Sequence, residues 1–82
     1  MTTTMHRPLC AIAREIARDW PAARSSQHPA GHYLAAMAEL WSIDQRYGAD
    51  DARYVIRYFL SNAGGWRGDT ARRVKAELKR ML

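Results

Sequence analysis

The last part of the chain, residues 52–82, reads as two amphipathic helices joined by a glycine-rich corner, and this pattern constrains the fold most. Gly64 and Gly65 are expected to end the first helix, because glycine readily adopts the left-handed conformation of a helix C-cap. Asp69 and Thr70 are favourable first residues for the second helix. Apolar residues at spacings of three and four define one buried face on each helix: Ala52, Val55, Ile56, Phe59, Leu60 and Ala63, then Ala71, Val74, Leu78 and either Met81 or Leu82.

The same segment carries most of the net charge. The formal charge is +5, and residues 66–82 contribute six basic and two acidic residues to it. A basic surface of this kind attracts nucleic acid or an acidic protein surface. Cations near a helix C-terminus are also favoured by the helix dipole, so a solvated helix face is the alternative reading of the same residues.

Two further helices are predicted upstream. Pro8 suits the first turn of a helix that ends at Trp20, since the residue before Pro21 disfavours the helical conformation. Residues 21–29 read as a loop, and Pro29 can open a second helix that is expected to end at Gly48. The apolar stripes of these helices are Leu9, Ile12, Ala13, Ile16, Ala17 and Trp20, then Tyr33, Ala36, Met37, Leu40, Ile43 and Tyr47.

Four short amphipathic helices predict an all-α fold, a compact bundle forming one domain over residues 1–82 with residues 1–6 flexible. A three-helix core with the C-terminal helix docked outside is the main variant. Asp50 and Asp51 are expected at the N-terminus of the third helix, where negative charge is favoured. No stretch alternates convincingly enough to predict a strand. The single cysteine, Cys10, and the lack of a long apolar run or signal-peptide pattern predict a soluble, cytoplasmic protein.

Candidate chemical groups are few. His28 and His32 have the i, i+4 spacing of two metal ligands, but no third ligand is evident. Cys10 lies near Arg14 without a recognisable partner for nucleophilic catalysis. Asp44 lies close to the apolar face of its helix, so we expect a structural ion pair with one of three arginines: Arg53, Arg57 or Arg67. The sequence therefore predicts no catalytic residue, metal or cofactor, and a protein that is not an enzyme.

Aromatic and basic residues are the better functional candidates. Tyr54 and Tyr58 are helical neighbours interleaved with arginines, a composition typical of protein interfaces and also suited to nucleic acid, although packing between helices accounts for the tyrosines as well. Trp66 at the corner is predicted to close the end of the bundle, with an exposed anchor as the alternative. The predicted partner-binding set is Arg53, Arg57, Trp66, Arg67, Arg72, Arg73, Lys75, Lys79 and Arg80.

A helix-turn-helix is a weaker interpretation of residues 52–82. The recognition helix would offer Thr70, Arg72 and Arg73 to a DNA groove. The connection from Gly64 to Asp69 is long for the standard turn, and Asp69 would meet phosphates.

Residues 47–53 (YGADDAR), 58–63 (YFLSNA), 66–68 (WRG) and 71–78 (ARRVKAEL) together resemble short proteins carried by phages and other mobile elements of bacteria. A fainter similarity lies in residues 12–16 (IAREI). Phage proteins of this size include anti-CRISPR inhibitors, so the resemblance implies an inhibitor of a bacterial defence complex that occupies a protein or nucleic-acid-binding surface. The expected partner is a bacterial protein or nucleoprotein complex, such as a CRISPR effector. The alternative is a small basic DNA- or RNA-binding regulator that uses the last two helices.

Overall fold

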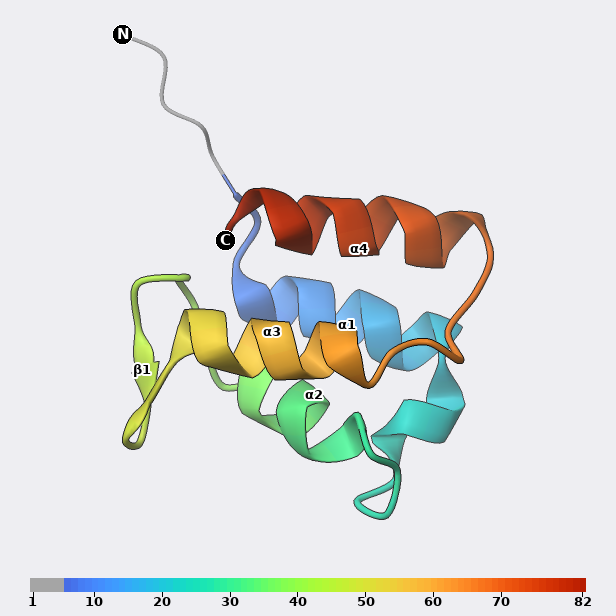
Figure 1. The fold of residues 1–82 in the computed structure, drawn as a ribbon, viewed down its shortest axis with the longest axis horizontal. Helices are drawn as coiled ribbons and strands as arrows, with labels where there is room; N and C mark the ends of the chain where they lie inside the picture. The colour runs from blue at the N-terminus through green and yellow to red at the C-terminus, as the bar shows by residue number, and fades with distance from the viewer. Residues whose placement is uncertain (1–5) are drawn as a thin grey trace, which may run out of the picture.

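In the computed structural model, which describes residues 6–82, most of the chain is helical (Figure 1). This confirms the predicted helical class, and a small antiparallel hairpin is the feature that the all-α prediction did not include. The predicted flexible segment, residues 1–6, lies outside the described residues except for His6. In chain order the elements are α1 (Leu9–Asp19), the 3₁₀ helix η1 (Pro21–Arg24), α2 (Gly31–Met37), β1 (Arg46–Tyr47), β2 (Asp50–Asp51), α3 (Ala52–Ser61) and α4 (Asp69–Arg80).

The helices surround one apolar core. Helix α1 packs against α2 and α4, and α2 also packs against α3 (Figure 1). No helix in residues 6–82 has the length and apolar character needed to cross a bilayer. The largest fully buried side chains are Phe59, Leu9, Ile12, Ile16, Met37, Leu40, Ile56, Leu78 and Val74, which are the residues that the predicted stripes supply.

Helix α1 forms as its sequence predicts. It begins directly after Pro8 and ends at Asp19, one residue before the Trp20–Pro21 step. Pro8 offers no side-chain cap, so the first backbone N–H groups of the helix need other acceptors. The amides of Leu9 and Cys10 donate to the carbonyl oxygens of Trp41 and Leu40, at 3.0 and 2.8 Å. A distant segment therefore caps α1.

This capping contact explains why α2 is shorter than predicted. The helix ends at Met37, and the expected continuation to Gly48 is wrong. Beyond it the chain turns so that the carbonyls of Leu40 and Trp41 reach α1, while Leu40 itself stays buried. The side-chain oxygen of Gln45 then accepts hydrogen bonds from the amides of Trp41 and Ser42, at 2.6 and 3.2 Å, which fixes the loop.

Gly48 serves the hairpin rather than a helix C-cap. Arg46 pairs with Asp51 and Tyr47 with Asp50, so Gly48 and Ala49 form the turn between the strands. Gly48 has φ +62°, a value that glycine adopts without strain. The side chain of Asp51 accepts a hydrogen bond from the amide of Arg53 at 2.8 Å and so caps α3, which confirms the predicted place of Asp51 at the N-terminus of this helix.

The corner between α3 and α4 also differs in detail from the prediction. Helix α3 ends at Ser61, with Asn62 as its C-cap, and neither Gly64 nor Gly65 adopts a positive φ. The side-chain amide of Asn62 donates to the carbonyl oxygen of Tyr58 at 2.8 Å and satisfies one of the last free carbonyls. The left-handed glycine of the corner is Gly68, with φ +109°, directly before α4.

Candidate functional site

Trp66 lies inside the molecule and closes one end of the core. Its side chain is 2% exposed, and its ring stacks on Trp20 with centroids 5.9 Å apart and planes 4° from parallel. Its indole N–H donates to the carboxylate of Asp19 at 2.7 Å. The predicted plug is confirmed, and the exposed anchor is wrong. Trp66 therefore offers no surface to a partner, and its place in the predicted partner-binding set is wrong.

Lys75 belongs to the same corner. Its ammonium group donates to the carbonyl oxygen of Trp66 at 2.7 Å and lies 5.9 Å from the centre of the indole ring. Burial, followed by the positive charges of Lys79 and Arg67, lowers the pKa of Lys75. The contacts with Trp66 give Lys75 a structural role at the corner.

Three arginines of the predicted set pair with carboxylates. Arg53 donates to Asp44 at 3.1 Å, which confirms one of the three expected ion pairs, but Asp44 is 77% exposed rather than buried. Arg72 pairs with Asp69 one helical turn earlier, and both side chains are well exposed. Arg73 pairs with Glu15 of α1. Exposed pairs such as Arg72–Asp69 contribute little stability, so Arg72 remains available to a partner.

The remaining cations define a basic surface on the corner and α4. We use that name for Arg67, Arg72, Lys79 and Arg80, all of which are exposed. Among the described residues, only Arg72 of these four has a carboxylate partner. Arg57 is likewise exposed and unpaired within residues 6–82, but it lies on α3 between two tyrosines.

An ion-pair network that the sequence analysis did not predict joins the chain before α1 to α4. The guanidinium of Arg7 donates to both carboxylate oxygens of Glu77, at 2.9 and 2.7 Å, and to Glu15 at 2.8 Å. The paired geometry on Glu77 is the strong bidentate form. No local pattern reveals this network, because Arg7 and Glu77 are 70 positions apart.

Because hydrogen bonds from arginine favour the carboxylate form, they lower the pKa of both acids. Arg73 and then Arg7 lower the pKa of Glu15, and Arg7 lowers that of Glu77, each from a usual value of 4.5. A carboxylate whose pKa is lower in the folded than in the unfolded protein stabilises the fold at pH values above its unfolded-state pKa. This stabilisation is lost as the pH falls through its folded-state pKa.

We therefore expect thermal stability to drop more between about pH 5 and about pH 3 in the wild type than in the double variant Glu15→Gln, Glu77→Gln. Circular dichroism melts across that range measure the difference. Glu39→Gln is the control, because Glu39 is exposed and has no ion pair among the described residues. An equal drop in all three proteins would contradict the role of the network.

The other sequence candidates do not converge on a site. His28 accepts a hydrogen bond from the amide of Ala30 at 3.0 Å and packs edge-on against Trp20, whereas His32 is exposed. Within residues 6–82, no three metal-ligating side chains lie together. Cys10 is half-buried.

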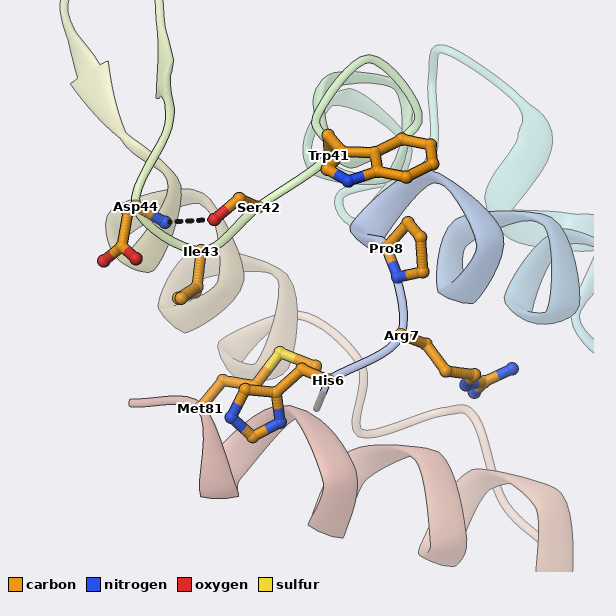
Figure 2. Close-up of a pocket in the computed structure, with 8 residues that line it drawn as sticks. All are labelled: His6, Arg7, Pro8, Trp41, Ser42, Ile43, Asp44 and Met81. Atoms are coloured by element: carbon orange, nitrogen blue, oxygen red, sulfur yellow. Dashed lines mark hydrogen bonds between the residues drawn. The ribbon is translucent and has the colours of Figure 1, made fainter. Parts of the chain in front are cut away.

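A pocket of about 280 Å³ lies between residues 6–8, the loop after α2 and the end of α4 (Figure 2). Trp41 and Pro8 form one wall, and Met81 with His6 forms another (Figure 2). Asp44 lies at the edge of the pocket, and its backbone amide donates a hydrogen bond to the hydroxyl of Ser42 at 3.1 Å. Trp41 is 67% exposed. Local sequence patterns do not predict this pocket, since three separate segments form its walls.

Residues 62–68 connect α3 to α4, which is longer than the turn of about 3–4 residues in a helix-turn-helix. Of the side chains proposed to read DNA, Arg73 pairs with Glu15 of α1, and the exposed carboxylate of Asp69 at the start of α4 would meet the phosphates. The geometry therefore argues against a recognition helix.

No protein-family model, curated protein or solved structure matches this chain. The resemblance to phage proteins stays a prediction.

Proposed function

We propose that this chain is a small, non-enzymatic interaction protein of phage type that inhibits a bacterial defence complex, such as a CRISPR effector, in the cytoplasm of the host cell. The observation that carries the proposal is the basic surface, where Arg67, Lys79 and Arg80 have no carboxylate partner in residues 6–82. Exposed cations of one sign raise the local potential and speed the association with an acidic partner. The sequence resemblance supplies the defence complex as the target.

The positive charge of the basic surface limits which parts of a defence complex it can bind. Effector channels that hold guide and target strands are themselves positively charged, so an empty channel repels this surface. The basic surface suits an acidic region of the effector protein, or the nucleic acid that the complex carries. A direct nucleic-acid regulator using the same cations is the second candidate.

The experiment reverses the charge of the basic surface and measures inhibition. Arg67→Glu, Lys79→Glu and Arg80→Glu are combined, leaving Arg73 and Lys75 intact because both make structural contacts. We expect wild-type protein to raise the plating efficiency of a targeted phage on CRISPR-active bacteria, and the triple variant to lose that effect. Unchanged inhibition by a folded triple variant would exclude this surface.

A matched control carries the same change in net charge elsewhere. Arg14, Arg18 and Arg24 are exposed on α1 and η1, and their joint reversal to glutamate should leave inhibition intact. Salt dependence separates the two candidates, because phosphate contacts release counterions. Binding to DNA through about four phosphates predicts a slope near −3.6 in log affinity against log salt. A protein partner that stays bound after nuclease treatment supports the inhibitor.

A further inference from the structure

The outward face of α3 carries a second surface, distinct from the basic surface on the corner and α4. Four residues at i, i+3, i+4 and i+7 spacing line a shallow pocket of about 330 Å³, and we call them the tyrosine face: Tyr54, Arg57, Tyr58 and Ser61. They lie opposite the buried stripe of the same helix. Tyr54 and Tyr58 are 46% and 39% exposed, which is high for large aromatic residues in a small domain.

Contacts within the molecule already hold these rings in place. Tyr58 stacks on Tyr33 of α2 with centroids 5.5 Å apart and planes 18° from parallel. Tyr54 packs edge-on against Tyr58 at 4.5 Å, and the two hydroxyl oxygens are 3.0 Å apart. These contacts restrict the two rings before a partner binds, which lowers the side-chain entropy that binding costs.

The tyrosine face presents hydrogen-bond donors. The hydroxyl pair of Tyr54 and Tyr58 uses one of its two hydrogens internally, so the other can donate outward. The hydrogen bond with Tyr58 raises the pKa of Tyr54 above its usual value of 10.0, and tyrosine hydroxyls of this kind are protonated at neutral pH. The guanidinium of Arg57 makes no hydrogen bond or ion pair within residues 6–82. A ligand that supplies negatively charged acceptors complements this set.

Charge also orients the ligand along the helix. Asp50 lies in β2, two residues before the start of α3, so a carboxylate already stands near the N-terminal end of the face and disfavours further negative charge there. Arg57 lies one helical turn further along α3 and favours negative charge. The acidic group of a ligand therefore belongs at Arg57, and its apolar part on the rings.

Protein fits this surface better than single-stranded nucleic acid. Base stacking uses free ring faces, and Tyr33 already covers one face of the Tyr58 ring. Tyrosine edges, hydroxyls and a single arginine are typical of the centre of a protein interface.

We propose that the tyrosine face docks a protein segment in which a carboxylate side chain stands beside an apolar one. The carboxylate binds the guanidinium of Arg57 and the free tyrosine hydroxyl, while the apolar side chain packs on the exposed edges of Tyr54 and Tyr58. This site is independent of the basic surface and of the defence target proposed above.

The test titrates the ¹⁵N-labelled protein with three probes and follows amide shifts by NMR. The probes are a short peptide of alternating aspartate and leucine, its asparagine–leucine counterpart, and single-stranded oligo(dT). We expect the acidic peptide to shift the amides of residues 54–61, and the asparagine peptide to bind about tenfold more weakly. Shifts there with oligo(dT) alone, or none with the acidic peptide at millimolar concentration, would overturn the proposal.

Two variants locate the contact. Arg57→Ala should weaken binding of the acidic peptide about tenfold, because it removes a hydrogen bond to a charged group. Arg24→Ala, an exposed arginine on η1, should leave binding unchanged. Equal affinity for both variants, with melts matching the wild type, would contradict the role of Arg57. The proposed function is tested separately, by the plating efficiency of a targeted phage after charge reversal on the basic surface. Either proposal can therefore fail without the other.

Discussion

Phe59→Ala is expected to lower the free energy of unfolding by about 3–5 kcal/mol, the range for truncation of a buried aromatic side chain. Phe59 is completely buried and packs edge-on against both Trp20 and Trp66, with centroid distances of 6.4 Å. Its removal leaves a cavity beneath the tryptophan stack. A small domain has about 0.05–0.15 kcal/mol of stability per residue, so this loss unfolds much of the population.

Chemical denaturation followed by tryptophan fluorescence measures the change, since Trp20 and Trp66 report on the same cluster. Trp41→Ala is the matched control, because it removes a larger aromatic side chain that is 67% exposed. We expect this control to cost no more than about 0.5 kcal/mol. A Phe59 variant as stable as the control would show that the core does not depend on this ring.

Gly31→Ala is expected to destabilise the protein by about 2–3 kcal/mol, although it adds only one methyl group. Gly31 is the first residue of α2 and is buried. A β-carbon at this position would overlap the carbonyl oxygen of Ser25 and lie 3.1 Å from that of Ala23. Both obstacles are backbone atoms, so a rotamer change cannot relieve the contact. The chain after η1 would have to move away from α2.

Gly64→Ala provides the matched comparison for this prediction. A β-carbon on Gly64 meets nothing within 4 Å, and its φ is not positive. Alanine there restricts the unfolded chain, so stability should be unchanged or rise by up to about 1 kcal/mol. Thermal melts of the two variants separate the effects. Equal stability would mean that residues 23–25 do not pack on Gly31 as described.

Helical periodicity predicted the parts of the fold in which neighbouring residues in the sequence are also neighbours in space. The stripe of α1 supplies Leu9, Ile12 and Ile16 to the core, and those of α3 and α4 supply Phe59 and Leu78 in the same way. Local chemistry also predicted Asp50 and Asp51 at the N-terminus of α3, where the structure makes Asp51 the N-cap. These features depend on spacings of three and four residues, which any single stretch of sequence displays.

The same periodicity failed after Met37. Leu40, Ile43 and Tyr47 continue the stripe of α2 and do pack on or within the core, but they reach it from a loop and a hairpin. The competing force is the need of α1 for acceptors at its uncapped start, which the carbonyls of Leu40 and Trp41 meet. Two segments separated by the whole of α2 share this contact, so no window of sequence contains it.

The sequence predicted the partner-binding residues by their type, and the fold places them in different parts of the molecule. Of the nine predicted residues, Trp66 is interior, Lys75 holds the corner and Arg73 joins α4 to α1. Arg53 on α3 pairs with Asp44. The exposed cations that remain lie on two surfaces, Arg57 on α3 and the others on the corner and α4.

By itself the sequence determined the helical class, the core stripes and the net charge of +5, because each follows from residue type and local spacing. Only the tertiary structure decided where α2 ends, which cations are neutralised and which aromatic rings face solvent. Those outcomes depend on pairs such as Arg7 with Glu77, or Tyr33 with Tyr58, that are distant in the chain. Charge and aromaticity are properties of a residue, whereas availability to a partner depends on the neighbours that folding provides.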